Sequence, residues 1–306
     1  MKPKVLLAGG TGYIGKYLSE VIENDAELFA ISKYPDNKKT DDVEMTWIQC
    51  DIFHYEQVVA AMNQIDIAVF FIDPTKNSAK ITQSSARDLT LIAADNFGRA
   101  AAINQVKKVI YIPGSRYDNE TIERLGAYGT TVETTNLVFK RSLVNVELQV
   151  SKYDDVRSTM KVVLPKGWTL KNVVNHFIAW MGYTKGTFVK TEKSHDQFKI
   201  YIKNKVRPLA VFKIVETADG IITLILLSGS LVKKYTVNQG KLEFRLIKES
   251  AVVYIHYDYI PRLFWPIYYF IQAPMQKMMI HGFEVDCRIK DFQSRLKSGE
   301  NMKYTK

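Results

Sequence analysis

The sequence predicts an α/β protein of two domains, in which a doubly wound parallel sheet is followed by an α+β domain. The chain has 306 residues, about twice the length of a typical domain. Strand and helix patterns alternate up to about residue 150, and a single helix followed by a run of strands comes after it. The charge also changes there, because residues 1–150 carry a net charge of −3 and residues 151–306 carry +13. We therefore expect domains over 1–150 and 151–295 and a basic tail over 296–306.

Composition excludes several classes of protein. Hydrophobic residues make up 46% of the chain and charged residues 24%, which is typical of a folded globular protein. The chain has two cysteines, Cys50 and Cys287, whose spacing fits neither a disulfide framework nor a zinc site, so we expect no metal. Neither a cleavable signal nor an apolar run of about 18 residues is evident, which predicts a cytoplasmic protein. The basic second half favours an anionic contact, but no nucleic-acid-binding motif accompanies the charge.

The elements of the first half follow one another at intervals that are typical of a doubly wound sheet. Strands are expected at Lys4–Ala8, Leu28–Ser32, Met45–Cys50, Ile67–Ile72, Val109–Ile112 and Val144–Val150. Helices are expected at Tyr13–Glu23, Ser85–Asn104 and around Gln57–Met62.

A glycine-rich turn links the first strand to the first helix. It reads Gly9-Gly10-Thr11-Gly12-Tyr13-Ile14-Gly15 and satisfies both the Gly-x-Gly-x-x-Gly and the Gly-x-x-Gly-x-x-Gly spacing. Such glycines permit a tight turn, close approach of a pyrophosphate to the backbone and close packing of helix on strand. The amides at the helix start then face the phosphates. The turn predicts a dinucleotide site.

Residues after the second, third and fourth strands indicate which dinucleotide binds. The second strand ends in Ser32 and Lys33, and a cation at this position accommodates a 2′-phosphate whereas an acid would bind the free ribose. NADP(H) is therefore expected in preference to NAD(H), the alternative being that Lys33 is an ordinary surface lysine. Asp51 is expected to meet the adenine amine or, alternatively, to cap a helix. Ile52 and Phe71 complete the expected cofactor contacts.

Taken together, these motifs resemble the atypical and extended short-chain dehydrogenase/reductases, including NmrA-like proteins. The resemblance rests on the glycine turn, on Ile31-Ser32-Lys33-Tyr34-Pro35, on Cys50-Asp51-Ile52, and on the segment from Asp95 to Ala101 leading into Lys108–Ile112. It implies a Rossmann-type NAD(P)-binding domain over residues 1–150 and leaves the reaction open.

The family's catalytic pair is missing from its expected place. Members use a Tyr-x-x-x-Lys motif, in which the lysine lowers the pKa of the tyrosine from about 10. The best-placed tyrosine here is Tyr128, but Val132 stands where the lysine belongs. Ser115 could line the nicotinamide pocket or be an ordinary loop serine. Tyr128 and Ser115 are thus the candidate catalytic residues, and whether the chain is an enzyme stays open.

The second half has a different order of elements. A strand is expected at Arg157–Leu164, and Thr169 is a good N-cap for the amphipathic helix that contains Val173 and Met181. Further strands are expected at Thr187–Lys193, Gln197–Ile202, Leu209–Glu216, Ile221–Ser228, Lys241–Lys248 and Ala251–Tyr259, before a terminal helix at Arg262–Met279.

This order is similar to that of the helix-grip (START/SRPBCC-like) fold. The whole chain then resembles the YbjT-type, two-domain NAD(P)-dependent epimerase/oxidoreductase family. Helix-grip domains commonly enclose an apolar cavity, which implies a small, apolar or carbonyl-bearing ligand. The aromatic run Tyr254–Phe270 has three interpretations: core packing, cavity lining, or contact with an anionic membrane surface.

Three functions remain open. The chain could be an NADP(H)-dependent reductase or epimerase, a non-enzymatic NADP(H)-binding redox sensor, or a carrier of an apolar ligand. The sequence does not indicate the oligomeric state.

Overall fold

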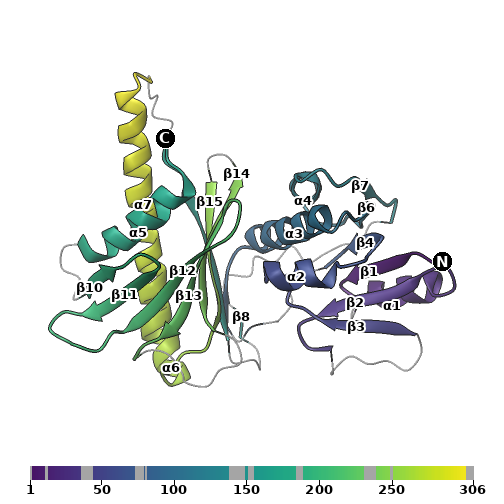
Figure 1. Ribbon diagram of the computed structural model, residues 1–306, viewed down its shortest axis with the longest axis horizontal. Helices are drawn as coiled ribbons and strands as arrows, with labels where there is room; N and C mark the ends of the chain where they lie inside the picture. Colours follow the sequence, from purple (N-terminus) through teal and green to yellow (C-terminus); the bar gives the residue numbers. More distant parts are fainter. Residues whose placement is uncertain are drawn as a thin grey trace. The chain divides into compact units, whose positions relative to one another are not determined.

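The computed structural model describes residues 2–10, 13–35, 44–72, 79, 81–137, 149–150, 155–183, 189–230, 239–248 and 251–300. The chain forms two compact units (Figure 1). The first comprises Met1–Ser78 and Ser85–Asn145, and the second comprises Ala79–Ser84 and Val146–Lys306. The short segment Ala79–Ser84 therefore leaves the first unit to join the second, an exchange that the sequence did not predict.

The first unit contains the expected parallel sheet. Its six strands lie in the order β3-β2-β1-β4-β6-β7, and all pairs are parallel. They are β1 (Lys4–Ala8), β2 (Glu27–Ser32), β3 (Met45–Gln49), β4 (Ile67–Phe70), β6 (Lys108–Tyr111) and β7 (Val132–Thr134). The direction of winding reverses between β1 and β4, and ligands of such sheets bind outside the carboxyl ends of the strands at this point. The predicted fold class is confirmed.

Helices cover both faces of this sheet. They are α1 (Tyr13–Ile22), α2 (Tyr55–Ala61), α3 (Ala86–Ile103) and α4 (Asp118–Gly126). Ile14 and Leu18 of α1 pack on a buried cluster that includes Leu7 and Ala30. On the opposite face α3 packs against α2 and α4. Side chains that alternate along each strand thus serve two cores.

The second unit is a nine-stranded sheet in the order β10-β11-β12-β13-β14-β15-β9-β5-β8. Its strands are β5 (Ile81–Gln83), β8 (Gln149–Val150), β9 (Val156–Val163), β10 (Val189–Lys193), β11 (Gln197–Ile202), β12 (Ala210–Ala218), β13 (Ile221–Ser228), β14 (Lys241–Lys248) and β15 (Ala251–Tyr259). Four of them match the predicted bounds to the residue. The pairing is antiparallel except between β5 and β9, which makes the sheet mixed.

One predicted strand belongs to a different sheet. Val144–Val150 was expected to complete the parallel sheet, but β7 takes that place. Gln149 and Val150 instead pair antiparallel with β5 in the second sheet, and residues 144–148 lie outside the described residues. Nothing in an apolar run specifies which open strand edge it will join, and β7 has only three residues, so its pattern gave no signal.

The helices of the second unit are α5 (Leu170–Tyr183), α6 (Trp265–Ile267), the π-helical segment η2 (Tyr268–Gln272) and α7 (Ala273–Lys297). Thr169 caps α5 as predicted, since its hydroxyl accepts the Asn172 N–H at 3.3 Å. The terminal helix continues well past the predicted end at Met279. Pro274 has no N–H to donate to the preceding turn, and the widened π-helical turn lies directly before it. Within the described residues, no helix combines the length and apolarity that crossing a bilayer requires.

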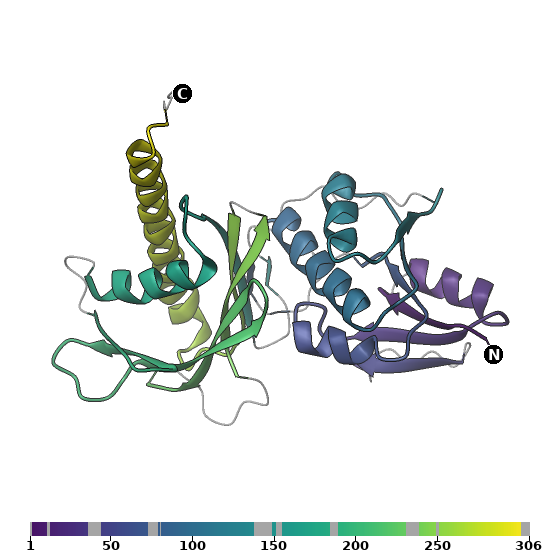
Figure 2. The same ribbon diagram turned by 45° about the horizontal axis from the view of Figure 1, so that its top comes forward.

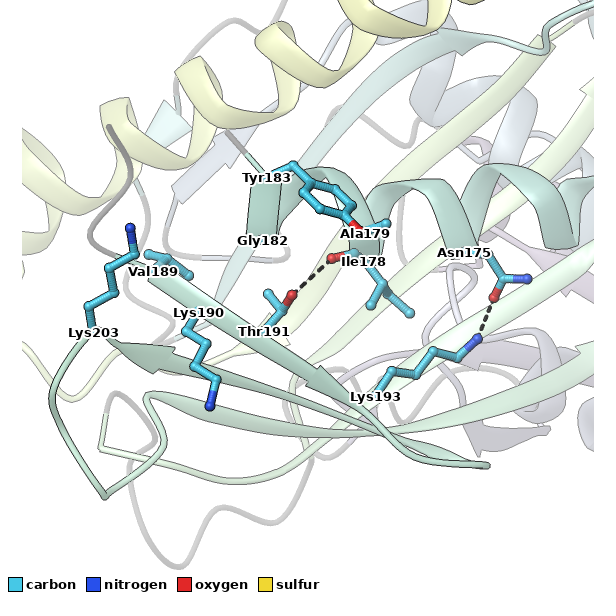
Figure 3. A pocket seen from close by; sticks show the side chains of 10 residues that line it. All are labelled: Asn175, Ile178, Ala179, Gly182, Tyr183, Val189, Lys190, Thr191, Lys193 and Lys203. Atoms are coloured by element: carbon cyan, nitrogen blue, oxygen red, sulfur yellow. Dashed lines mark hydrogen bonds between the residues drawn. The ribbon is translucent and has the colours of Figure 1, made fainter. Parts of the chain in front are cut away.

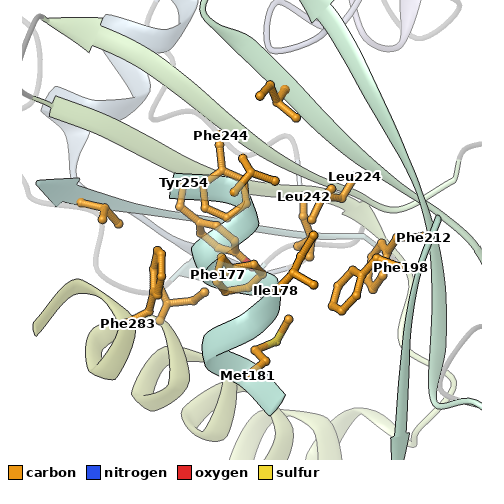
Figure 4. Close-up of a cluster of buried hydrophobic side chains, with 14 of the residues drawn as sticks. Phe177, Ile178, Met181, Phe198, Phe212, Leu224, Leu242, Phe244, Tyr254 and Phe283 are labelled. Atoms are coloured by element: carbon orange, nitrogen blue, oxygen red, sulfur yellow. The ribbon is translucent and has the colours of Figure 1, made fainter. Parts of the chain in front are cut away.

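A cluster of aromatic side chains joins α5 and α7 to the same face of the second sheet (Figure 4). The ring of Phe177 lies 5.1 Å from the rings of both Phe244 and Phe283, and Phe244 lies 5.5 Å from Tyr254. Figure 2 shows the long α7 beside this sheet, the arrangement expected of a helix-grip domain. These side chains occupy the space where an apolar cavity was expected, and the apolar ligand stays a prediction.

We expect Phe177→Ala to lower the free energy of unfolding of the second unit by about 3–5 kcal/mol, because Phe177 is fully buried among these rings. Phe270→Ala is the matched control, since Phe270 is 74% exposed, and its effect should stay within about 0.5 kcal/mol. Urea unfolding followed by tryptophan fluorescence measures both, because three of the four tryptophans lie in this unit. Equal effects of the two variants would contradict the assignment of this core.

Candidate functional site

The glycine turn at the end of β1 is wedged tightly against its neighbours. Gly9 has a φ of +121°, which favours glycine, and a Cβ there would lie 2.8 Å from the Phe71 ring. A Cβ on Gly10 would lie 2.8 Å from that of Ala30, and one on Gly15 would lie 2.5 Å from the backbone of Gly10. Neighbouring side chains therefore fill the space beside Gly9 and Gly10, and backbone fills the space beside Gly15. This is the cradle that a pyrophosphate requires, so the described part of the turn fits a dinucleotide.

Several predicted residues lie in or beside this turn. Thr11 and Gly12 lie outside the described residues, and of Tyr13 only the backbone is described, at the start of α1. Ile14 is half-buried and packs into the core beneath α1. Phe71, which follows β4, is 4% exposed and forms a wall of the turn through its contact with Gly9.

The residues expected to select the cofactor meet at the ends of β2 and β3. The Lys33 ammonium lies 3.2 Å from a carboxylate oxygen of Asp51 and 5.6 Å from the centre of the Tyr34 ring. The hydroxyl of Ser32 accepts the N–H of Tyr34 at 3.2 Å. The sequence did not predict that Lys33 and Asp51 pair with each other. A phosphate beside Lys33 would thus approach a cation whose charge is already partly balanced.

Asp51 shapes the turn that leads to α2. Its other carboxylate oxygen accepts the N–H of Phe53 at 3.1 Å, and its own N–H donates to the Gln57 side chain at 2.8 Å. The N-cap position of α2 is occupied by His54. The alternative interpretation of Asp51 as a helix cap is therefore wrong, because the carboxylate closes a turn three residues earlier. Ile52 is buried within this turn.

The loop after β6 is held by one carboxylate. Asp118, the first residue of α4, accepts hydrogen bonds from the Tyr111 hydroxyl at 2.5 Å and from the backbone N–H groups of Gly114 and Ser115 at 3.0 Å. The hydroxyl of Ser115 accepts the N–H of Tyr117 at 3.2 Å. Ser115 is half-buried at the carboxyl edge of the sheet, the edge that carries the glycine turn.

Tyr128 lies at the opposite edge. It belongs to the connection between α4 and β7, and such helix-to-strand connections lie at the amino ends of parallel strands. Its hydroxyl donates to Asp95 at 2.6 Å, and Arg99 and Arg124 also pair with that buried carboxylate, at 3.0 and 3.2 Å. Burial, with the charge of Asp95 added, raises the pKa of Tyr128 well above its ordinary value. The structure therefore places the Tyr128 hydroxyl in the helix layer, at the edge of the sheet opposite the glycine turn.

Two residues that the sequence analysis did not single out also contribute. Trp47 of β3 lies beneath the turn, with its ring 3.5 Å from the position of a Cβ on Gly10. Asp118 organises the Ser115 loop. Alternation along β3 could have placed Trp47 on the α1 face of the sheet, whereas no spacing rule identifies Asp118.

A second concavity lies in the other unit, between α5 and the edge strand β10 (Figure 3). Its volume is about 360 Å³, and Ile178, Ala179 and Val189 line part of it. The other lining groups include Lys190, Lys193 and Lys203. Lys193 donates to the Asn175 side chain at 2.5 Å, and Lys190 to Glu192 at 2.7 Å. More of the lining surface is apolar than polar, and the three lysines add positive charge to it.

Comparisons with known proteins agree with the fold of the first unit. The model of the NAD dependent epimerase/dehydratase family matches residues 5–119, so the N-terminal region is an NAD(P)-binding Rossmann domain of this type. Over its full length the chain is 99% identical to the auxiliary protein GraX of Staphylococcus aureus, and each sequence is covered completely.

Solved structures match over part of their length. A nucleoside-diphosphate-sugar epimerase from Staphylococcus aureus is 18% identical, with 43% of this chain and 49% of that chain covered and a TM-score of 0.36. Pen from Bacillus thuringiensis is 20% identical, with 57% and 56% covered and a TM-score of 0.35. The chain spans about half the length of these two structures.

We expect Gly15→Ala to abolish NADPH binding, because its Cβ would collide with the Gly10 backbone at 2.5 Å and push α1 away from the turn. Gly126→Ala is the control, since its Cβ would meet only a Val132 methyl group at 3.4 Å. Isothermal titration calorimetry measures binding, and circular dichroism checks that each variant is folded. If a folded Gly15→Ala variant bound NADPH normally, the turn would not hold the phosphates.

Proposed function

Since the chain belongs to the family of the auxiliary protein GraX, we propose that its first unit binds NADP(H) as a regulatory ligand. In this proposal the protein does not use NADP(H) to oxidise or reduce a substrate. The observation that carries this proposal is the place of Tyr128, at the sheet edge opposite the glycine turn and hydrogen-bonded to Asp95. The name "auxiliary" given to the relative agrees with a supporting role.

The cofactor proposal rests on the carboxyl edge of the parallel sheet. The glycine turn supplies backbone N–H groups for the pyrophosphate, at the positive end of α1. Lys33 would hold a 2′-phosphate and Asp51 would accept from the adenine amine, with Ser32 and Ile52 beside them. Phe71 would lie at the glycine turn, beside Gly9. A bound 2′-phosphate would draw Lys33 away from Asp51. The exchange of one anionic partner for another supports selection of NADP(H) by charge.

The catalytic argument rests on proton transfer. NADP(H) supplies a hydride or accepts one when it takes part in a reaction, and a general acid or base must then be within reach. The phenol of Tyr128 donates to Asp95 and has a raised pKa, so its proton is held by the helix layer. Val132 stands at the position where the family has a lysine that would lower the pKa of this tyrosine.

A reductase or epimerase is the second candidate, favoured by the match of residues 5–119 to the epimerase/dehydratase family. In this case Ser115 is the candidate proton donor at the correct edge of the sheet. Its hydroxyl accepts the Tyr117 N–H, and its proton has no acceptor within the described part of the chain. The second unit, like the helix-grip domain of the YbjT-type family, would then hold a small apolar or carbonyl-bearing substrate.

We expect NADPH to bind at least about tenfold more tightly than NADH, because about 1.4 kcal/mol is within the range of one charge-assisted contact. Lys33→Ala should remove this preference while leaving NADH affinity within about threefold of the wild type. Lys107→Ala is the control, since Lys107 pairs with Asp66 before β4 starts, at the other edge of the sheet. Calorimetry with both cofactors is the measurement, and an unchanged preference in Lys33→Ala would rule out this role for Lys33.

We expect no NADPH oxidation above the background rate with a panel of quinones, aldehydes and ketones. Tyr128→Phe should bind NADPH normally but lower the free energy of unfolding by about 1–3 kcal/mol, because Asp95 loses a buried donor. Absorbance at the NADPH maximum and urea unfolding measure the two effects. Turnover that falls about a thousandfold in Tyr128→Phe would make Tyr128 catalytic, and turnover lost in Ser115→Ala would favour the second candidate.

A further inference from the structure

The long helix α7 has two apolar faces. Ile280, Phe283 and Cys287 are buried against the second unit's core. Another series, which we name the outer stripe, consists of Met275, Met278, Val285, Ile289 and Leu296. Each of its members is exposed, Met278 at 73%. The inner series accounts for the packing of α7, whereas the members of the outer stripe are not buried by any of the described residues.

The spacing places the outer stripe on a single side of the helix. Met278 and Val285 are 7 residues apart, and so are Ile289 and Leu296. Met275 and Ile289 are 14 residues apart. Positions separated by seven residues lie on one face of an α-helix. The 25 residues of α7 make this face about 37 Å long. Exposed apolar rows of this length mark interaction surfaces.

Exposed aromatic and aliphatic residues also precede α7 along the chain. Phe264 and Phe270 are 72% and 74% exposed, and Ile267 and Ile271 between and beside them are also exposed. Trp265 lies in the same segment, partly buried against the core. Aromatic and aliphatic side chains of this kind are typical of the apolar side of helices that lie in a membrane interface.

The acidic residues of α7 have partners within the second unit, and its lysines do not share them. Its acids are directed to partners within the unit: Asp286 contacts His176 at 2.5 Å, Asp291 pairs with Arg295 at 2.8 Å, and the buried Glu284 pairs with Arg288. The lysines of α7 differ from these acids in their ion pairing.

Lys277, Lys290 and Lys297 make no ion pair within the described residues. Arginines of α7 balance the charges of Glu284 and Asp291. The three lysines outnumber the remaining acid, Asp286, so the sides of the outer stripe carry net positive charge. Two copies of α7 placed face to face would bring like charges together, which opposes association. An anionic surface would be complementary to both the stripe and its charged sides.

From these observations we propose that the outer stripe of α7 docks on the surface of an anionic lipid bilayer. The helix would lie in the plane of the interface, with Phe264, Phe270 and Met278 among the acyl chains and the lysines among the headgroups. This surface lies in the second unit, and the proposal goes beyond nucleotide binding. It requires no membrane-spanning segment.

Co-sedimentation of the full chain with phosphatidylcholine vesicles, with or without about 30% phosphatidylglycerol, tests the proposal. Binding is expected to the anionic vesicles, to weaken at high salt, and to be slight on the neutral ones. Met278→Glu should weaken binding at least about tenfold, because it puts a charge on the apolar stripe. Val206→Glu is the matched control, as Val206 is 93% exposed elsewhere in the unit, and it should bind as the wild type does.

A second pair of variants separates charge from apolar contact. Lys277→Gln combined with Lys290→Gln should weaken binding by about fivefold per lysine, while Lys203→Gln combined with Lys205→Gln should have little effect. Circular dichroism and NADPH titration show that each variant is folded. Failure of the wild type to bind anionic vesicles, or equal binding by Met278→Glu, would overturn the proposal. A dimer in light scattering that Met278→Glu dissolves, without vesicle binding, would identify a second copy as the partner instead.

Discussion

In the first unit, helix α1 begins so close to the preceding turn that a Cβ on Gly15 would touch the backbone of Gly10. This contact between two glycines fixes the direction in which the helix leaves β1. It also determines which groups surround the turn, since Gly9 rests on Phe71 and Gly10 lies over Ala30 and Trp47. The turn is therefore supported by side chains from three other strands or strand ends. A phosphate site built in this way needs no charged side chain of its own.

Two carboxylates organise the rest of that unit, each at a different edge of the sheet. Asp118 gathers a hydroxyl and two N–H groups at the carboxyl edge. Asp95 gathers two arginines and a phenol within the helix layer. A buried carboxylate needs such partners, because without them desolvation would be costly. The need of Asp95 for donors gives Tyr128 a role that requires no neighbouring lysine, because its hydroxyl donates to this buried acid.

The sequence predicted most of the fold because periodicity reports burial, and burial decides these elements. The strand Ile221–Ser228 matched to the residue, since it is a short, almost continuous apolar run bounded by Gly220 and Gly229. Pairing was harder to predict: Gln149–Val150 and Ile81–Gln83 form strands that depend on each other across a long separation in the chain. Within the site, the glycines were predictable from spacing alone. The ion pair between Lys33 and Asp51 was not, because it joins the ends of two strands whose adjacency depends on the fold.

The terminal helix shows how a pattern can be misjudged when two faces are apolar. Core packing was one of three interpretations of the aromatic run Tyr254–Phe270, and Tyr254, Tyr259 and Tyr268 do pack in the core. Phe264 and Phe270 come from the same run and are exposed. A single apolar stripe on a helix reports one core, whereas α7 carries one face that the sheet covers and another that it cannot reach. The inward acids of this helix show the same division, since each of them has a partner within the unit while three lysines beside the outer stripe have none among the described residues. The second face was thus encoded by charge as well as by apolar spacing, and only the position of the sheet reveals which of the two faces remained uncovered.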